Sequence, residues 1–343
     1  MINSNIAVLG AGSWGTALAN LLANKGYNVN LWMRNSDQYK TMVATGENNR
    51  YLPGIKLAPS LNYHLDIQKA LHEAQIIVIA VPTQQVRSLI RSCKQFIIND
   101  QIIVNVAKGL EQNTHYRISE VVKEELGDQP YAILSGPSHA EEVAKNMPTT
   151  VVVASKDRNV AELVQNAFMT LDFRVYTNPD VVGVELGGAL KNVIAFGAGI
   201  VDGLGFGDNA RAALMTRGIR EIARLGSTMG ANVYTFAGLS GIGDLMVTCT
   251  SMHSRNRRAG ILIGQEKSLE ETLKEIGMVV EGITTTKVAY ELSKQMNIDM
   301  PITEQIYNVL YGNFEVNEAV TNLMTRNKKQ EIEEVIAEEI IAW

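Results

Sequence analysis

The sequence has little cysteine and no excess of basic residues. Only Cys93 and Cys249 occur among 343 residues, far apart and without a CxxC pattern. A secreted chain of this size would more often use disulfides, so this usage favours a reducing compartment. We interpret Cys249 as a small buried hydrophobe. The net charge of −5 argues against nucleic-acid binding, which usually needs a basic face.

Long apolar runs and metal-ligand spacings are also missing. The longest purely aliphatic run, 76–81, is far too short to span a membrane. Glycines interrupt the apolar residues after Leu9, so we expect no signal peptide. The five histidines show no spacing such as HxxxH, so we expect no metal in the chemistry. We therefore expect a soluble, cytoplasmic protein without stable membrane insertion.

The length makes two domains the default. In the first half, short apolar runs alternate with amphipathic stretches, which predicts a parallel sheet with right-handed crossovers. The expected strands are 6–9, 29–32, 76–81, 102–106, 131–134, 150–154 and 174–177, with helices at 16–25, 86–93, 116–126 and 160–171. From residue 181 the apolar period is helical, at 181–201, 210–229, 269–275, 284–295, 303–310 and 328–341.

A glycine-rich loop joins the first expected strand to the first expected helix. Gly10 permits a tight turn, Gly12 lets a pyrophosphate approach the backbone, and Gly15 allows close helix–strand packing. The amides of Ser13 and Trp14 would point at phosphate from the helix N-terminus. The alternative is a glycine turn in a similar fold that has lost its ligand. We predict an α/β fold, with a Rossmann-type doubly wound parallel sheet in 1–179 followed by an all-α domain in 180–343.

The end of the second expected strand indicates which dinucleotide binds. An NAD site places an acid there for the ribose 2′-hydroxyl. Here Arg34 and Asn35 follow the strand, and the first acid is Asp37. Arg34 can face a 2′-phosphate, so the sequence favours NADP(H), with NAD(H) as the alternative cofactor. An exposed loop arginine is the other interpretation of Arg34.

Lys191 lies among Gly, Ala and aliphatic residues in GVELGGALKNVIAFGAGIVDG. Apolar surroundings disfavour the charged ammonium and lower its pKa, which suits a general acid or base. The alternative is a lysine that buries its stem and keeps its ammonium in water.

Two segments after expected strands are candidate ligand contacts, because ligands bind at the carboxyl edge of a parallel sheet. Lys108 follows strand 102–106, and Gly136 with Pro137 forces a turn after strand 131–134. Ser138 would cap a helix with Glu141 three residues on, and this capping does not exclude ligand contact through the Gly136–Ala140 backbone. A surface loop lysine is the alternative for Lys108.

A Ser-Arg-Asn segment in the second half suits an oxyanion such as phosphate. Ser254 would open a helix whose amides face the anion, and the guanidinium of Arg255 would bond two oxygens. Asn256 follows directly. The alternative is a capped helix with a basic surface face. Asp244 is either a turn residue or a partner that orients the ammonium of Lys191.

A series of blocks resembles, in order, the signatures of the bacterial NAD(P)-dependent glycerol-3-phosphate dehydrogenase family. They are GAGSWGTALA, VPTQQVR, AKGLE, LSGPSHAEEVA, NPDVVGVELGGALKNV, GDNARAAL, LSGIGDLMVTCTS, HSRN, VVEGITTTK and MPIT. The resemblance covers essentially the whole chain. It implies a Rossmann domain before a helical domain, a cytoplasmic homodimer, and interconversion of glycerone phosphate and sn-glycerol 3-phosphate with NAD(P)H for phospholipid synthesis.

Carried over by position, the resemblance implies Lys191 as proton donor and acceptor and Lys108 as a second substrate-contacting lysine. The other implied substrate positions are Gly136, Ser138, Asp244, Ser254, Arg255 and Asn256. The implied cofactor positions are Ser13, Trp14, Arg34, Asn35, Tyr51, Lys108, Ala140, Arg255, Val279 and Glu281. Many relatives carry arginine where Asn35 stands, which puts a strict preference for NADP in doubt.

Two other functions fit parts of this pattern. A β-hydroxyacid dehydrogenase of the same two-domain plan would also use a lysine on the first helix of an α domain, but the Ser-Arg-Asn segment and AKGLE argue against it. A dinucleotide-sensing regulatory protein would not need Lys191, Asp244 and Arg255 together.

Overall fold

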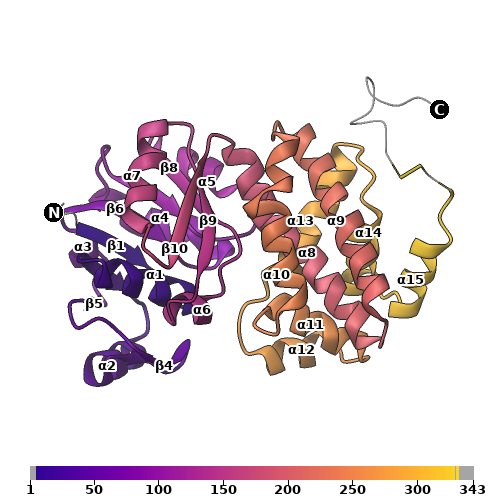
Figure 1. The fold of residues 1–343 in the computed structure, drawn as a ribbon, viewed down its shortest axis with the longest axis horizontal. Coiled ribbons are helices and arrows are strands. Elements are labelled where there is room, and N and C mark those ends of the chain that lie inside the picture. The colour runs from indigo at the N-terminus through magenta and orange to yellow at the C-terminus, as the bar shows by residue number, and fades with distance from the viewer. Residues whose placement is uncertain (1–4, 329, 332–343) are drawn as a thin grey trace.

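The computed structural model describes residues 5–328, 330 and 331 (Figure 1). The first half holds an eight-stranded sheet in the order β10-β9-β8-β7-β6-β1-β2-β5. Its strands are β1 Asn5–Leu9, β2 Asn28–Trp32, β5 Asn62–His64, β6 Ala74–Ile79, β7 Ile102–Asn105, β8 Tyr131–Ser135, β9 Thr149–Ala154 and β10 Phe173–Asn178. The two-stranded hairpin of β3 Glu47–Asn48 and β4 Leu52–Lys56 stands apart from this sheet.

Seven α-helices and two short 3-10 turns accompany the strands in this half. They are α1 Ser13–Asn24, α2 Ser36–Thr45, α3 Ile67–Leu71, η1 Thr83–Gln85, α4 Val86–Cys93, η2 Lys94–Phe96, α5 Ile118–Leu126, α6 Ala140–Ala144 and α7 Arg158–Phe168. The central strands are buried almost throughout, as is usual for apolar strands in a parallel sheet covered on both faces. The doubly wound α/β plan is therefore confirmed.

One strand pair departs from the parallel pattern. β9 runs antiparallel to β8, whereas β10 is again parallel to β9. The expectation of a wholly parallel sheet is wrong here, because a parallel neighbour needs a crossover that returns the chain over the sheet. The connection after β8 instead holds only the five-residue α6, which packs against α1.

The second half is helical, and no strand follows Asn178 in the part of the chain that the structure describes. Its elements are α8 Val181–Gly203, α9 Asp208–Thr228, η3 Val233–Ala237, the π-turn η4 Leu239–Gly243, α10 Asp244–Thr250, α11 Arg255–Gly264, α12 Leu269–Ile276, α13 Glu281–Gln295, α14 Pro301–Tyr311 and α15 Val316–Met324. Most of the last predicted helix, 328–341, lies outside the described residues.

The helix α8 forms the centre of this half (Figure 1). Among the described residues it is the one helix long and apolar enough to cross a membrane, and its apolar stretch is wholly buried inside the protein. Helices α9, α10, α11 and α13 pack around it. The apolar character of α8 thus serves packing against protein.

Glycines bring α8 and α11 into backbone contact. A Cβ at Gly199 would lie 2.0 Å from the carbonyl oxygen of Arg257, and one at Gly260 would lie 2.0 Å from that of Phe196. Gly203 and Gly264 repeat this arrangement one turn further along both helices. The close approach fixes the start of α11, where the Ser-Arg-Asn segment lies, against α8.

A buried carboxylate ties α8 to the sheet half. Glu185 accepts hydrogen bonds from the Arg117 guanidinium, from the backbone and hydroxyl of Ser119, and from the Tyr131 hydroxyl, at 2.6–2.9 Å. Because Tyr131 begins β8 and Ser119 lies in α5, this carboxylate sets the position of α8 relative to the sheet.

Candidate active site

The candidate site lies where the carboxyl ends of β7 and β8 meet α8 and α10. Lys108 follows β7, and Gly136 follows β8 with a φ of +128°, a conformation that favours glycine. Lys191 lies in the middle of α8, and Asp244 is the first residue of α10. The structure therefore brings together residues that are up to 136 positions apart in the sequence.

The carboxylate of Asp244 binds both lysines. Its Oδ1 accepts a hydrogen bond from Lys191 Nζ at 2.6 Å, and its Oδ2 accepts one from Lys108 Nζ at 2.6 Å. Burial by itself would raise the pKa of Asp244, but the two ammonium groups outweigh it and hold the pKa below its ordinary value. The predicted partnership of Asp244 and Lys191 is present, and it includes Lys108.

Lys191 is buried, with 6% of its surface exposed. Its Nζ also donates to Thr248 Oγ1 at 2.6 Å. Burial lowers the pKa of Lys191 to about 8, against the opposing charge of Asp244 and with help from the charge of Lys108. The burial excludes the alternative in which the lysine extends its ammonium into water, and the lowered pKa suits proton exchange near neutral pH.

Lys108 reaches from the sheet half to the same point. Its Nζ donates to the Gly136 carbonyl at 2.8 Å and lies 3.5 Å from Ser138 Oγ. The Ser138 hydroxyl donates to Gly136 O at 2.8 Å. The predicted helix cap at Ser138 is wrong, because α6 begins two residues later at Ala140. The turn at Gly136 directs the serine hydroxyl back toward Lys108 instead.

The predicted helix start in the Ser-Arg-Asn segment is confirmed. Ser254 caps α11 by accepting from the Arg257 amide at 3.2 Å, and α11 begins at Arg255. Arg255 donates one N–H to the Val279 carbonyl at 3.0 Å. A guanidinium carries five N–H donors, so this bond leaves others for a ligand.

Asn256 is held by protein groups on both sides of its amide. Its Nδ2 donates to Asn192 Oδ1 at 2.8 Å, and its Oδ1 accepts from the Gly282 amide at 2.8 Å. Asn192 in turn donates to the Lys108 carbonyl at 3.0 Å. Asn256 therefore links α11 to α8, α13 and the loop after β7, and keeps one N–H for a ligand.

The glycine loop has the geometry that a dinucleotide phosphate needs. Gly10 has a φ of +122°, and a Cβ at Gly15 would lie 2.0 Å from the Gly10 carbonyl. A Cβ at Gly12 would meet nothing within 4 Å, so the backbone there is open to approach. Ser13 and Trp14 begin α1, whose first turn has no acid to oppose an anion.

The loop is braced by residues of α2 and of the segment that follows it. Gln38 Nε2 and Asn48 Nδ2 both donate to the Ala11 carbonyl, at 2.6 and 3.0 Å. Ser13 Oγ donates to the carbonyl of Tyr51 at 2.6 Å. The β3–β4 hairpin thus holds Tyr51 beside the start of α1.

Arg34 and Asn35, which follow the buried Met33 after β2, are exposed. Arg34 is exposed and has no ion-pair or hydrogen-bond partner within the described part of the chain. Asn35 caps α2 by accepting from the Gln38 amide at 2.8 Å. Its structural role is a helix cap, which keeps its amide at the same edge as Arg34.

The remaining predicted cofactor positions lie at the starts of α6 and α13 and in the loop before α13. Ala140 begins α6 and packs with Ala17 and Leu52 near Trp14. Val279 is exposed and accepts from Arg255. Glu281 begins α13 and accepts from the Thr83 amide at 3.0 Å. Burial raises the pKa of Glu281, against that hydrogen bond and the charge of Arg255.

Several residues of this network were missed by sequence reasoning. Thr248 lies four residues after Asp244 on α10, and this spacing could have indicated it, since such residues share a helix face. Asn192 stands next to Lys191. Asn48 and Thr83 carry no local signal. Asn48 donates to Ala11 and Thr16, which are 37 and 32 positions away. The amide of Thr83 donates to Glu281, which is 198 positions away.

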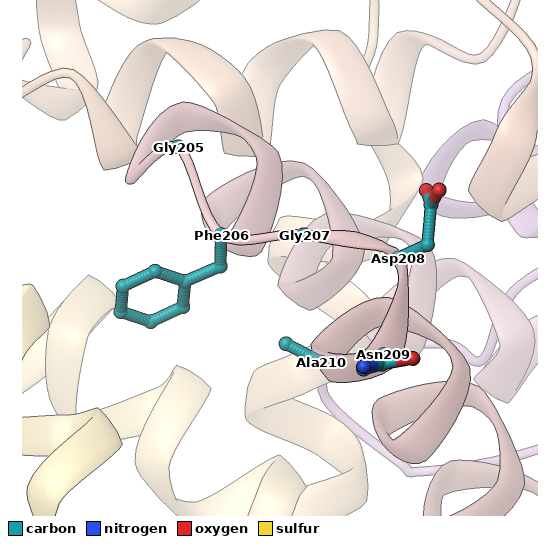
Figure 2. A pocket seen from close by; sticks show the side chains of 6 residues that line it. All are labelled: Gly205, Phe206, Gly207, Asp208, Asn209 and Ala210. Atoms are coloured by element: carbon teal, nitrogen blue, oxygen red, sulfur yellow. The ribbon is translucent and has the colours of Figure 1, made fainter.

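An open depression of about 700 Å³ lies at the turn between α8 and α9. It is lined by Gly205, Phe206, Gly207, Asp208, Asn209 and Ala210. Figure 2 shows that the Asp208 carboxylate points away from the Phe206 ring. None of the predicted site residues lines it.

Two family models match the two halves of the chain. The N-terminal model of NAD-dependent glycerol-3-phosphate dehydrogenase matches residues 5–161, and the C-terminal model matches residues 180–321. The chain belongs to this family. It is 56% identical over 338 residues to a glycerol-3-phosphate dehydrogenase [NAD(P)+] of Pelotomaculum thermopropionicum, with 97% of each chain covered. It is 57% identical over 332 residues to one of Moorella thermoacetica, covering 97% of this chain and 99% of the relative.

Solved structures agree with this membership. The crystal structure of glycerol-3-phosphate dehydrogenase from Coxiella burnetii has a TM-score of 0.91 and 42% identity, covering 94% of this chain and 99% of that one. A structure of D-mandelate dehydrogenase, at 12% identity and a TM-score of 0.64, covering 92% and 99%, shares the fold alone. The family resemblance read from the sequence is confirmed, and the β-hydroxyacid dehydrogenase alternative is not favoured.

Proposed function

We propose that this enzyme interconverts glycerone phosphate and sn-glycerol 3-phosphate with NAD(P)H, and that Lys191 is its proton donor and acceptor. Family membership supports the reaction. The observation that carries the residue assignment is the buried Lys191 ammonium, held by Asp244 and Thr248. Its pKa of about 8 allows both directions of proton transfer.

The dinucleotide would lie on the glycine loop and α1, with Gly12, Ser13 and Trp14 at its phosphates and Arg34, Asn35 and Tyr51 toward its ribose. Ala140, Val279 and Glu281 would complete its site. When bound, its nicotinamide supplies or takes up the hydride at C2 of the substrate. The open backbone at Gly12 and the acid-free first turn of α1 fit such a group.

The chain itself supplies the proton and the substrate's position. Lys191 donates a proton to the oxygen on C2 during reduction, and its charge stabilises that oxygen as negative charge develops. Lys108, Gly136 and Ser138 approach the same region from the sheet half.

Residues at the start of α11 bind the substrate phosphate. Arg255 bonds the substrate phosphate through its remaining N–H donors, together with Ser254 and the spare N–H of Asn256. Because these residues bind the phosphate, which is remote from the reacting carbon, they keep C2 of the substrate beside Lys191.

We also propose the assembly and setting of the enzyme. Residues 1–179 form the dinucleotide-binding domain and 180–343 the substrate domain, since β10 ends at Asn178 and α8 begins at Val181. The protein is a cytoplasmic homodimer whose product supplies phospholipid synthesis, a proposal supported by the family resemblance.

A spectrophotometric assay tests the function. Glycerone phosphate should be reduced with NADPH, with NADH or with both, while 3-hydroxycarboxylates should not be oxidised. Activity on the carboxylates alone would support the β-hydroxyacid dehydrogenase instead. Cofactor binding without turnover of any of these substrates would support a regulatory protein.

A further inference from the structure

Two histidines that the site described so far does not use lie against each other. His139 lies in the turn between β8 and α6, directly after Ser138. His253 lies in the turn between α10 and α11, directly before Ser254. Their ring centroids are 5.5 Å apart with the rings tilted by 51°. The contact therefore joins a residue of the sheet half to the turn that carries the Ser-Arg-Asn segment.

The ring of His139 has an unused buried nitrogen. Its Nε2 is buried and has no hydrogen-bond partner in the described structure. A buried polar atom is expensive to leave unpaired, so such atoms in native proteins usually have a partner in the functional state. The packing against His253 places this ring beside the start of α11, where the substrate phosphate is expected.

The charges around His139 indicate which form of the ring is present. Burial lowers the pKa of His139, and the nearby Lys191 lowers it further, while Glu141 and Glu142 on α6 oppose this and His253 adds a small lowering. At neutral pH the ring is thus uncharged, with one nitrogen as an N–H donor and the other as an acceptor. A phosphate oxygen accepts from such a donor and completes its hydrogen bonding.

We propose that His139 is a further phosphate-recognising residue, which donates its Nε2–H to the substrate phosphate from the sheet half while Arg255 holds the same group from α11. This assignment rests on the proposed reaction. It explains why the two histidines meet beside the Ser-Arg-Asn turn, and it makes substrate capture depend on both halves of the molecule.

Two substitutions distinguish the effect of the His139 hydrogen bond from the effect of the shape of its ring. His139→Phe keeps a flat ring and removes the donor, whereas His139→Gln keeps a side-chain N–H near the position of Nε2. We expect His139→Phe to lower kcat/KM for glycerone phosphate by about tenfold, since a hydrogen bond to a charged group is worth at least that much. We expect His139→Gln to recover most of the loss. Unphosphorylated dihydroxyacetone should show less than a twofold change in either variant.

Inorganic phosphate provides a second measurement that does not depend on turnover of the analogue. Its inhibition constant against glycerone phosphate should rise in His139→Phe by about the same factor as kcat/KM falls. The matched control is His72→Phe, because the His72 side chain is 74% exposed and far from this turn in sequence. This control should leave both constants unchanged.

Failure of the proposed reaction and failure of the role of His139 give different results. If the native enzyme does not reduce glycerone phosphate, the proposed function fails. If it does, but His139→Phe binds phosphate as the native enzyme does, or loses activity equally on both substrates, or matches His139→Gln, then His139 does not recognise phosphate. If His139→Phe folds poorly, the phosphate inhibition constant of His139→Gln decides. We expect it to lie within about threefold of the native value, and a larger change would contradict the proposal.

Discussion

At the scale of single residues, the role that we propose for Lys191 follows from its burial, because a buried ammonium is costly to keep charged. The carboxylate of Asp244 offsets part of that cost, and the pKa settles at about 8. We expect Lys191→Met, which keeps the length of the side chain, to lower kcat by ~10²–10⁴, the usual contribution of general acid–base catalysis. Asp244 keeps Lys108 as a partner, so the fold should survive.

The control for this substitution is cofactor binding. A fluorescence titration of Lys191→Met with NADPH should give a dissociation constant close to that of the native enzyme. Turnover close to the native value in the variant would show that another group moves the proton.

The same pKa predicts the pH dependence of the reaction. Reduction of glycerone phosphate requires the protonated ammonium, so kcat/KM should fall as pH rises through about 8. Oxidation of glycerol 3-phosphate requires the neutral amine, so its kcat/KM should rise through the same pH. Measuring kcat/KM for both directions from about pH 6 to about pH 10 would check this. If kcat/KM changed in the same direction with pH for both reactions, a single acid–base group would be contradicted.

Cofactor choice is also decided at the residue scale. Arg34 is exposed at the end of β2, and no acid precedes Asp37. A guanidinium pairs with a 2′-phosphate in a fork, so the native enzyme should bind NADPH more tightly than NADH. The preference should shrink as salt screens this exposed pair. Arg34→Asp should weaken NADPH binding and leave NADH binding nearly unchanged, and equal weakening of both would show that another residue reads the 2′-phosphate.

At the scale of secondary-structure elements, the contact between α8 and α11 positions the turn that we propose to bind the substrate phosphate. A methyl group at Gly260 would collide with the Phe196 carbonyl, because the added Cβ would lie 2.0 Å from that oxygen. We expect Gly260→Ala to push α11 away from α8. The melting temperature should fall, and KM for glycerone phosphate should rise because Arg255 and Asn256 begin the displaced helix.

The matched control is Gly207→Ala, where the added methyl group would meet nothing within 4 Å. This change at the start of α9 should cost at most about 1 kcal/mol, the usual range for a helix cap. Calorimetry and steady-state kinetics on both variants would test the argument. If Gly260→Ala were destabilised but kept its KM, the packing of α11 against α8 would contribute to stability and not to substrate binding.

The elements that the sequence predicted well are those with a strong apolar period. The predicted helix at 181–201 corresponds to α8, and the predicted strands at 76–81 and 102–106 correspond to β6 and β7. Short elements such as α3 and β5 were missed because three to five residues do not establish a period. The reversed β9 was missed because strand direction depends on the path of the connection, and apolar patterning is the same for both directions.

The candidate site was predicted unevenly for a similar physical reason. Lys191, Lys108 and Asp244 stand in distinctive local contexts, and the structure brings them together. Asn256 was predicted as a ligand contact, yet two of its hydrogen bonds are made to Asn192 and Gly282. Contacts between residues so far apart follow from tertiary packing, and a single sequence does not display them.

At the scale of the whole molecule, one carboxylate joins the two halves at the point of chemistry. Lys108 belongs to the sheet half and Lys191 to the helical half, and Asp244, which is 1% exposed, binds both. Since two ammonium groups repel each other, the negative charge of Asp244 between them favours the close approach of the two halves. The ionised carboxylate is therefore part of both the stability of the molecule and the pKa of its acid.

The substitution Asp244→Asn tests this double role because it keeps the shape and removes the charge. Leaving buried charges without their partner typically costs about 3–5 kcal/mol, so the melting temperature should fall clearly. The pKa of Lys191 should also fall, since the charge of Asp244 raises it and that of Lys108 lowers it. The decline of glycerone phosphate reduction with rising pH should then begin below pH 8. Asp37→Asn, at a side chain that is 89% exposed, should change neither quantity. A destabilised Asp244→Asn whose pH profile stayed in place would mean that Asp244 holds the halves together without setting the acidity of Lys191.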